Sequence, residues 1–432
     1  MAAAQVQPVQ QRRVRPCPVD PGYFTELFSL KTLNRFFVIS PKLGLLLILL
    51  LCAFVASSCT KVKAAQGWAG PIVNNETLYA FTLKDGLIGL NPQSGDPKPK
   101  LNSTGNPTVD DKGRTVYLSF SPKKLNKNIS SASYSTPLIV NETSMLITAR
   151  LANQRDSVII KLDPNTFANA DLLTTTVFGR INDDLLLIGD TVYISSVDHN
   201  LYAIDVANGT PKWSEPYNAG AELWATPALY NGRLYVGDTS GKLVSLDPKT
   251  GGDVQVITEV EGSINMTPLI VDDVAYFGTF GNKMYAVNVV TKTQVWSKPI
   301  EADKWFWARP IISDGVLYVA GMDSYLYAID AATGNLKWRY LLTGPARTAP
   351  VIVDKTLIVA TVNYGNQKGR IHAFDISNPD GGPHFLWDEN ARASVIAPLD
   401  VKDKTVYFTN IDGEYFALDV PQRKRLWEYV AP

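Results

Sequence analysis

Cysteine and histidine are scarce in this sequence, and their scarcity narrows the chemistry that the chain can perform. Its 432 residues include three histidines and three cysteines, Cys17, Cys52 and Cys59. No two cysteines are adjacent, no CxxCH haem-attachment motif occurs, and the histidines form neither an HxH pair nor an HExxH zinc motif. The chain also lacks a GxSxG nucleophile elbow and a GxxxxGK[ST] phosphate loop. We therefore expect no catalytic residue and no metal site.

Long hydrophobic runs and strong net charge are missing too. The stretch 43–56, LGLLLILLLCAFVA, has fourteen uncharged residues, which suits an export signal better than a membrane span of ~20 residues. The formal charge is zero, yet residues 1–42 carry six basic and two acidic side chains, a net +4, which leaves −4 for the remainder. A basic flank favours a cytoplasmic N-terminus and an extracytoplasmic body. A weakly acidic body argues against nucleic-acid binding.

The segment that follows the hydrophobic stretch, Ala-Ser-Ser-Cys at 56–59, resembles the end of a bacterial lipoprotein signal. The resemblance implies that Cys59 is the lipidated first residue of the mature protein, after a 1–42 cytoplasmic or signal n-region and a 43–59 hydrophobic signal segment. Acyl chains contribute ~0.8 kcal/mol of membrane affinity per buried CH₂. An uncleaved signal anchor over 36–58 is the alternative. Both readings place the protein on the extracytoplasmic face of a bacterial membrane.

A four-residue signature, apolar-any-apolar-Asp/Asn, recurs eight times, starting at positions 88, 160, 202, 244, 285, 327, 372 and 416. Six of the seven spacings are 41 to 45 residues. Each unit combines alternating apolar strands with Gly-containing turns, which indicates four strands per unit. The sequence therefore predicts an all-β, eight-bladed β-propeller of four-stranded antiparallel blades over 67–432, preceded by the signal or anchor segment, because radial closure protects strand edges. A solenoid is the alternative, although the units are too long for one β-helix coil.

Two copies, LYAIDVANGTPKW (201–213) and LYAIDAATGNLKW (326–338), resemble the quinoprotein-type, or PQQ-like, propeller repeat. That family includes quinone-dependent dehydrogenases and the BamB-like lipoproteins of outer-membrane β-barrel assembly, which are closest in layout. The resemblance implies the fold more firmly than any activity. The dehydrogenases of that family hold PQQ with an adjacent cysteine pair and a calcium site. Because this chain has no adjacent cysteines, we expect no cofactor here. A PQQ- or other small-ligand-binding enzyme or sensor is the alternative function.

Prolines at the start of six units place a column of candidate binding residues in register. Pro71, Pro137, Pro227, Pro268, Pro310 and Pro350 begin equivalent inner strands, and Leu185 takes this place in another unit. We expect the residues three positions earlier to form a ring at one mouth of the central channel, extended by Trp305 and Phe306. The alternative is that these side chains plug the channel or pack between blades. The ring residues are Trp68, Tyr134, Asn182, Trp224, Asn265, Trp307 and Arg347.

Four other tryptophans, Trp213, Trp296, Trp338 and Trp427, share an outer-strand position and are expected to be packing residues rather than ring members, and His372 is expected to be a packed strand residue. About 30 additional residues, at about 103–132, separate the first two units and form an added hairpin, a degenerate ninth blade or a partner-binding loop. Together these features predict a membrane-tethered scaffold that binds envelope proteins or peptides.

Overall fold

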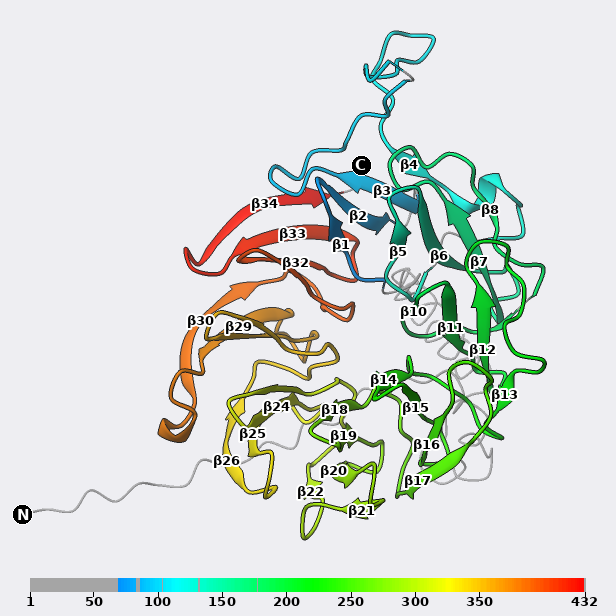
Figure 1. Cartoon of the computed structure of the whole chain (residues 1–432). Helices are drawn as coiled ribbons and strands as arrows, with labels where there is room; N and C mark the ends of the chain where they lie inside the picture. The colour runs from blue at the N-terminus through cyan, green and yellow to red at the C-terminus, as the bar shows by residue number, and fades with distance from the viewer. Residues whose placement is uncertain (1–68, 83–85, 103, 131–132, 177, 431–432) are drawn as a thin grey trace, which may run out of the picture. The chain divides into compact units, whose positions relative to one another are not determined.

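Eight antiparallel β-sheets are arranged in a ring, one sheet for each copy of the repeat (Figure 1). The computed structural model describes residues 69–82, 86–102, 104–130, 133–176 and 178–430. Strands within each blade are paired in chain order, with the first strand at the centre of the ring. The prediction of an all-β, eight-bladed propeller is confirmed.

Blades 1 to 4 contain β1 (Ile72–Asn74), β2 (Thr77–Thr82), β3 (Gly86–Leu90), β4 (Ser119–Phe120), β5 (Leu138–Asn141), β6 (Ser144–Arg150), β7 (Asp156–Leu162), β8 (Asp171–Leu172), β9 (Phe178–Gly179), β10 (Leu186–Ile188), β11 (Thr191–Ser195), β12 (Asn200–Asp205), β13 (Tyr217–Asn218), β14 (Ala228–Tyr230), β15 (Arg233–Gly237), β16 (Lys242–Leu246) and β17 (Gln255–Glu259). A short 3₁₀ helix, η1 (Pro122–Lys124), follows β4.

Blades 5 to 8 contain β18 (Leu269–Val271), β19 (Val274–Gly278), β20 (Lys283–Asn288), β21 (Thr293–Gln294), β22 (Ile300–Glu301), β23 (Ile311–Ser313), β24 (Val316–Ala320), β25 (Tyr325–Asp330), β26 (Leu336–Leu341), β27 (Val351–Val353), β28 (Thr356–Ala360), β29 (Arg370–Asp375), β30 (His384–Asn390), β31 (Asp400–Lys402), β32 (Thr405–Thr409), β33 (Glu414–Asp419) and β34 (Lys424–Val430), with η2 (Pro379–Gly381) before β30. In blades 2 and 5 the outer strand is split, because β8 and β9 both pair with β7, and β21 and β22 both pair with β20. Each blade therefore has four strand positions.

The repeated Asp or Asn is the last residue of the third strand or directly follows it in every blade, and it organises the turn that comes next. In blade 4, Asp247 Oδ1 accepts the Lys249 N–H at 2.9 Å, and the Gly251 N–H donates to the Asp247 carbonyl at 2.9 Å. Gly251 has φ +71°, a conformation that favours glycine. The same side-chain contact to the residue two or three positions later occurs in all eight blades, at Asn91, Asp163, Asp205, Asp247, Asn288, Asp330, Asp375 and Asp419.

The four outer-strand tryptophans are packing residues, as predicted, and the structure shows that they join neighbouring blades. Trp213 Nε1 donates to the Pro248 carbonyl of the next blade at 2.9 Å, and its ring covers Gly251, where a Cβ would come within 2.7 Å of the indole. Tyr193 packs against the same indole with ring centroids 5.8 Å apart. Equivalent bonds run from the remaining three indoles, Trp296, Trp338 and Trp427, to carbonyls of the following blade.

Blade 8 closes the ring on blade 1 with the same contacts. Trp427 Nε1 donates to the Pro92 carbonyl at 2.8 Å, between residues 335 positions apart in the chain. The Val73 N–H donates to Asp400 Oδ2 at 2.7 Å, and the Phe81 N–H to the Tyr415 hydroxyl at 2.8 Å. No covalent link is involved in these contacts, so side-chain packing and hydrogen bonds hold the first and last blades together.

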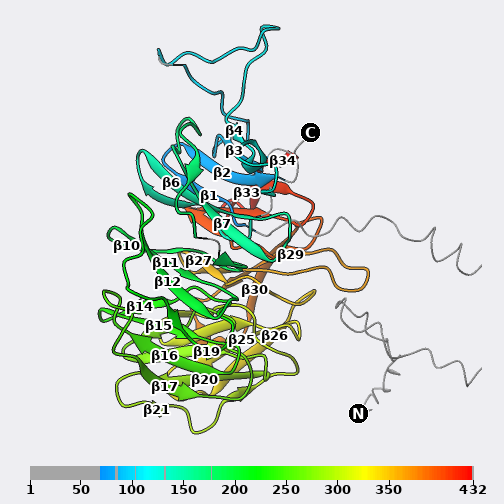
Figure 2. The ribbon, with the colours of Figure 1, turned by 90° about the vertical axis from the view of Figure 1, so that its right-hand side faces the viewer.

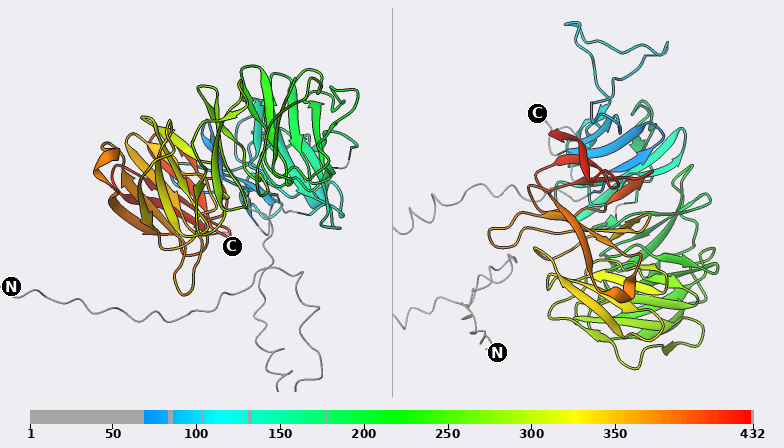
Figure 3. Two further views of the ribbon diagram at one scale, coloured as in Figure 1. Left: turned by 90° about the horizontal axis from the view of Figure 1, so that it is seen from below. Right: turned by 90° about the vertical axis from the view of Figure 1, so that its left-hand side faces the viewer.

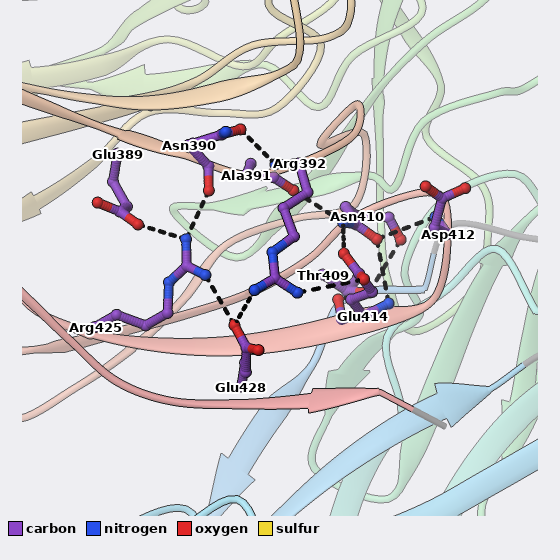
Figure 4. Close-up of polar contacts among 10 residues, drawn as sticks. All are labelled: Glu389, Asn390, Ala391, Arg392, Thr409, Asn410, Asp412, Glu414, Arg425 and Glu428. Carbon is purple, nitrogen blue, oxygen red and sulfur yellow. Dashed lines mark hydrogen bonds and ion pairs between the residues drawn. The ribbon is translucent and has the colours of Figure 1, made fainter. Parts of the chain in front are cut away.

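An alternating ion-pair network joins blades 7 and 8 at their outer strands (Figure 4). Arg425 bonds to Glu389 of β30 and, at 2.9 Å, to Glu428 of its own strand. Glu428 also bonds Arg392 at 2.5 Å, and Arg392 lies 3.6 Å from Glu414. The Arg425 side chain is 22% exposed, so these charges are screened less than an isolated surface pair.

Replacing Arg425 with methionine is expected to lower the free energy of unfolding by about 1–2 kcal/mol, because Glu389 loses its arginine partner and Glu428 keeps only Arg392. A double-mutant cycle with Glu389→Gln should give a coupling energy of about 0.5–1 kcal/mol that shrinks as salt is added. The control pair is Lys404 and Asp354, which also joins blades 7 and 8 but is 62% exposed on both sides. Its coupling should be indistinguishable from zero; equal coupling in the two pairs would contradict the role assigned to the network.

His372 lies inside blade 7, as predicted, with 2% of its surface exposed. Its Nε2 atom is 2.9 Å from the Thr343 hydroxyl. Burial lowers the pKa of His372 to about 4, so the side chain is neutral at physiological pH and serves as a packed strand residue.

Candidate functional site

Six of the seven predicted ring residues line one cavity at the inner strands of the propeller. The cavity has a volume of about 510 Å³. Each of these residues lies four positions before the first residue of its blade's inner strand, so the shared register places them at the same level. They are Tyr134, Asn182, Trp224, Asn265, Trp307 and Arg347. Trp68 lies outside the described residues.

The eighth ring position is filled by Ile396, which the alignment on prolines misses. Ile396 lies four residues before β31 and lines the cavity. The preceding residue, Val395, donates its N–H to the Thr361 carbonyl, as the preceding residue Leu223 in blade 4 donates to Ser196. Pro398 stands one position earlier relative to its strand than the other prolines, and this shift hid the equivalence.

Aromatic rings form a continuous cluster on one side of the mouth. Trp224 and Trp307 meet edge to face with centroids 6.3 Å apart, and Phe280 lies 5.2 Å from Trp307 and 5.6 Å from Trp305. Trp305 is 37% exposed. Phe306 was predicted to extend this patch, which is wrong: it is 1% exposed and packs into the blade interface against Tyr327. Adjacent residues of an extended chain point to opposite sides, so only one of the pair 305 and 306 can face the mouth.

Two arginines cover aromatic rings at the mouth. The Arg347 guanidinium lies 4.1 Å from the centroid of Trp307, and that of Arg150 lies 3.7 Å from the centroid of Tyr134. Burial lowers the pKa of both arginines, although guanidinium groups stay charged in proteins. Cation–π stacking holds the planar groups in fixed orientations. The mouth therefore presents flat apolar surface together with fixed positive charge.

Below the mouth, residues one or two positions after the ring column form a polar neck. Asp184 accepts the Thr136 N–H at 2.6 Å, and Asp183 accepts the Thr226 N–H at 2.9 Å. Burial, with a smaller contribution from the Asp183 carboxylate, raises the pKa of Asp184 to about 7. Arg309 lines the same cavity, where the surrounding protein lowers its pKa and the nearby Asp183 carboxylate opposes that shift. The neck thus combines two acids and one base that the predicted ring does not include.

Two polar atoms in the cavity wall have no hydrogen-bond partner among the residues that the structure describes. The Thr348 hydroxyl is buried, in a residue that is 3% exposed, and Asn265 Oδ1 is likewise unpaired. Leaving such groups unsatisfied costs about 1–3 kcal/mol each relative to a bonded state. They mark positions where water or a bound molecule can supply the missing bond.

The channel does not offer the donor set of a calcium-quinone site. Its two carboxylates, Asp183 and Asp184, accept backbone N–H bonds from neighbouring blades, and Asp184 holds its proton up to about pH 7. Among the described residues there is no group of three or more His, Cys, Asp or Glu side chains suited to a metal ion. The residues that line the channel therefore do not fit a calcium-bound PQQ.

Cys59 and the segments 1–42 and 43–59 lie outside the described residues. Within the described part of the chain, no helix is both long and apolar enough to cross a membrane.

Comparison with known proteins identifies relatives that share this repeat. A family model described as outer membrane protein assembly factor BamB matches residues 142–309 and 301–381, together more than half of the chain. BamB of Alkalilimnicola ehrlichii is 26% identical over 208 residues, which cover 45% of this chain and 50% of that protein. An uncharacterized protein of Rickettsia conorii is 25% identical over 221 residues, or 48% of this chain and 50% of that protein. The chain therefore spans about half the length of these curated relatives.

Solved structures agree on the fold. The crystal structure of BamB from Moraxella catarrhalis matches with a TM-score of 0.52 at 17% identity, covering 80% of this chain and 96% of that one. The computationally designed protein Ika8 gives a TM-score of 0.52 at 14% identity, covering 68% and 85%. At such identities the likeness speaks for the fold alone. The family model, which matches more than half of the sequence, places this chain in the family of the outer membrane protein assembly factor BamB.

Proposed function

We propose that this protein is a membrane-tethered, extracytoplasmic scaffold whose channel mouth binds segments of other envelope proteins. The observation that carries the proposal is the aromatic and arginine-lined mouth around a cavity of about 510 Å³. Tryptophan and arginine are enriched among residues that dominate protein-binding energies. A cavity of this size admits a few side chains of an extended segment rather than a folded domain. Membership of the BamB family supports a role in outer-membrane protein assembly.

The membrane link is proposed to be a lipid on Cys59, with the uncleaved signal anchor over 36–58 as the other form. Either form holds the propeller at the extracytoplasmic face of a bacterial membrane, close to its partners. Mass spectrometry of the protein extracted from its own membrane separates the two, because a processed lipoprotein has lost residues 1–58 by cleavage and carries acyl mass on Cys59, whereas the signal anchor keeps those residues.

A small planar ligand is a second candidate occupant of the same cavity. The unpaired Thr348 hydroxyl and Asn265 carbonyl oxygen, beside two tryptophans, favour it. The absorption spectrum of protein purified from its own membrane distinguishes the two functions. A bound chromophore would favour the ligand, whereas a spectrum of protein alone would favour the scaffold.

Combined replacement of Trp224 and Trp307 by alanine is expected to weaken partner binding at the mouth at least thirtyfold, because two hot-spot side chains contribute roughly 2 kcal/mol or more. Crosslinking in membranes identifies the partner, and titration of the purified pair measures the affinity. Trp338→Phe is the matched control, since it alters an indole at a blade interface, away from the cavity. If the double variant binds as tightly as the control, the mouth is not the binding site.

A further inference from the structure

Blade 1 carries an arm, residues 98–117, at a position where blades 6, 7 and 8 have a single residue. In blade 8 the outer strand has a β-bulge: Ala417 pairs with Trp427 and Leu418 with Arg425, which leaves one residue between them unpaired. In blade 1 the equivalent pairs are Leu90 with Pro97 and Ile88 with Ser119, with the Gly89 N–H bonded to the Leu118 carbonyl. The arm therefore replaces one bulged residue with twenty and leaves the blade register intact on both sides.

Backbone hydrogen bonds give the arm a defined base. Lys98 N donates to the Gly89 carbonyl, Gly89 N to Leu118 and Leu118 N to Lys98, at 2.7 to 3.0 Å, which closes a three-way cycle. A second cycle joins residues 100, 116 and 108 in the same manner, at 2.7 to 2.8 Å. Because these backbone groups are paired within the arm, an added strand cannot claim them, and recognition would fall to the side chains.

Two tight turns complete the arm as a pair of prongs that project beyond the blades (Figure 2 and the right panel of Figure 3). Asn102 Oδ1 accepts the N–H groups of Thr104 and Asn106. Asp110 Oδ1 accepts those of Lys112 and Arg114. Each turn has a glycine with positive φ, +79° at Gly105 and +74° at Gly113, so both tips are built from polar residues that favour turns.

Large apolar side chains are exposed behind these tips. Leu101 is 48% exposed, Val109 57% and Tyr117 51%. The propeller does not need them for its core, since blades 6, 7 and 8 complete the same strand with a one-residue bulge. Apolar residues held in the open on an ordered arm are typical of an interaction surface.

The arm and the loop after β4 are also the basic part of the propeller. Residues 97–127 contain seven basic and two acidic side chains, a net +5, which leaves −9 for the rest of 43–432. Leu125, Lys123, Lys124 and Lys127 in that loop are exposed. Only Leu118 and the two-residue strand β4 separate the arm from this loop along the chain. A basic surface with apolar centres fits an acidic surface with apolar pockets.

We propose that the blade 1 arm and the following basic loop dock an acidic surface of a partner protein, independently of the channel mouth. A lipid leaflet fits less well than a protein. The exposed apolar residues lie behind polar tips that include Asp110 and Asp111, whereas insertion into a bilayer needs apolar residues at the tip. The occupant is therefore a folded protein that contacts the sides of the prongs.

A deletion of residues 99–117 tests the arm without disturbing the blade. It leaves Pro97-Lys98-Leu118-Ser119, which matches Leu336-Lys337-Trp338-Arg339 of blade 6 and its one-residue bulge. A photoreactive amino acid in place of Val109, in full-length protein in its membrane, captures the partner; the same substitution at exposed Val290 of blade 5 is the control. The captured partner is then purified and titrated against the wild type, the deletion variant and a Lys123→Glu, Lys124→Glu, Lys127→Glu variant.

We expect a crosslink at an acidic segment of one protein from position 109 and none from position 290. Binding of the wild type should weaken as salt is added. The charge-reversal variant should bind at least about tenfold more weakly than the wild type, and the deletion variant more weakly still. Vesicles containing phosphatidylglycerol serve as the second probe. The proposal is overturned if no protein adduct forms, if both variants bind the partner as tightly as the wild type, or if the arm contributes to binding of the vesicles alone. Because Trp224 and Trp307 are untouched, binding at the channel mouth is measured separately.

Discussion

Replacing Trp427 by alanine is expected to lower the free energy of unfolding by about 3–5 kcal/mol, the range for a buried large aromatic side chain. Trp427 is 8% exposed, packs over Gly95 and against Tyr407, and donates to the Pro92 carbonyl. Its removal opens a cavity between the first and last blades and leaves that carbonyl without the indole N–H. Denaturation in urea, followed by far-ultraviolet circular dichroism, measures the loss.

Trp213→Ala is the matched control, because Trp213 makes the same contacts between blades 3 and 4. Its local cost should be similar, but blades 3 and 4 are also joined by the continuous chain. Trp427→Ala should in addition make blade 1 the first region cleaved by a protease under native conditions, since side-chain contacts and hydrogen bonds, with no chain connection within the described residues, hold it to blade 8. Identical cleavage patterns in the two variants would contradict the special role of ring closure.

The repeat was sufficient to predict the fold, because its strongest signals act locally. An Asp or Asn after an apolar strand caps a turn through its own side chain, and all eight copies make that contact. The tryptophans share a register with the turns, so their packing role follows from the same periodicity. These features depend on residues close in sequence and on the adjacent blade.

The residues of the site could be predicted only where they lie at a fixed distance before an inner strand. Trp224 and Trp307 were found because they lie at a fixed distance before a proline, whereas Ile396 was hidden by a proline displaced by one residue. Phe280 comes from a loop between the second and third strands of blade 5, and Arg150 from the end of β6. Neither belongs to the ring column, so their contribution depends on how blades pack together rather than on sequence period.

The additional residues show the same limit. The spacing of the repeat marks an interval of about 103–132, whereas the structure places the departure from the blade at 98–117 and uses Ser119–Phe120 as β4. The sequence of the arm, with its prolines and polar turns, has no periodic pattern that marks where it leaves the outer strand of blade 1. Only the pairing of Gly89 with both Lys98 and Leu118 reveals that the arm begins and ends at one bulge.

Replacing Asp184 by asparagine is expected to have little effect on stability near pH 4 and to stabilise the protein near pH 8. The pKa of Asp184 is about 7 in the fold, against about 3.9 in an unfolded chain. The protonated carboxyl therefore contributes its stability in full below about pH 4, and this contribution is lost as pH rises through 7. The difference amounts to at most about 4 kcal/mol. Asparagine keeps the acceptor for the Thr136 N–H and never ionises.

Urea denaturation of both proteins between pH 4.5 and 8.5 gives the difference in unfolding free energy, which should grow with pH in favour of the variant. Asp190→Asn is the control with the opposite sign, because Lys212 lowers the pKa of Asp190 and its contribution is present at high pH. Parallel stability curves for Asp184→Asn and the wild type would mean that Asp184 is ionised throughout. Divergent curves would mean that the neck gains a negative charge near neutral pH, beside Asp183 and Arg309, so that the electrostatic character of the channel changes where a bound segment would enter it.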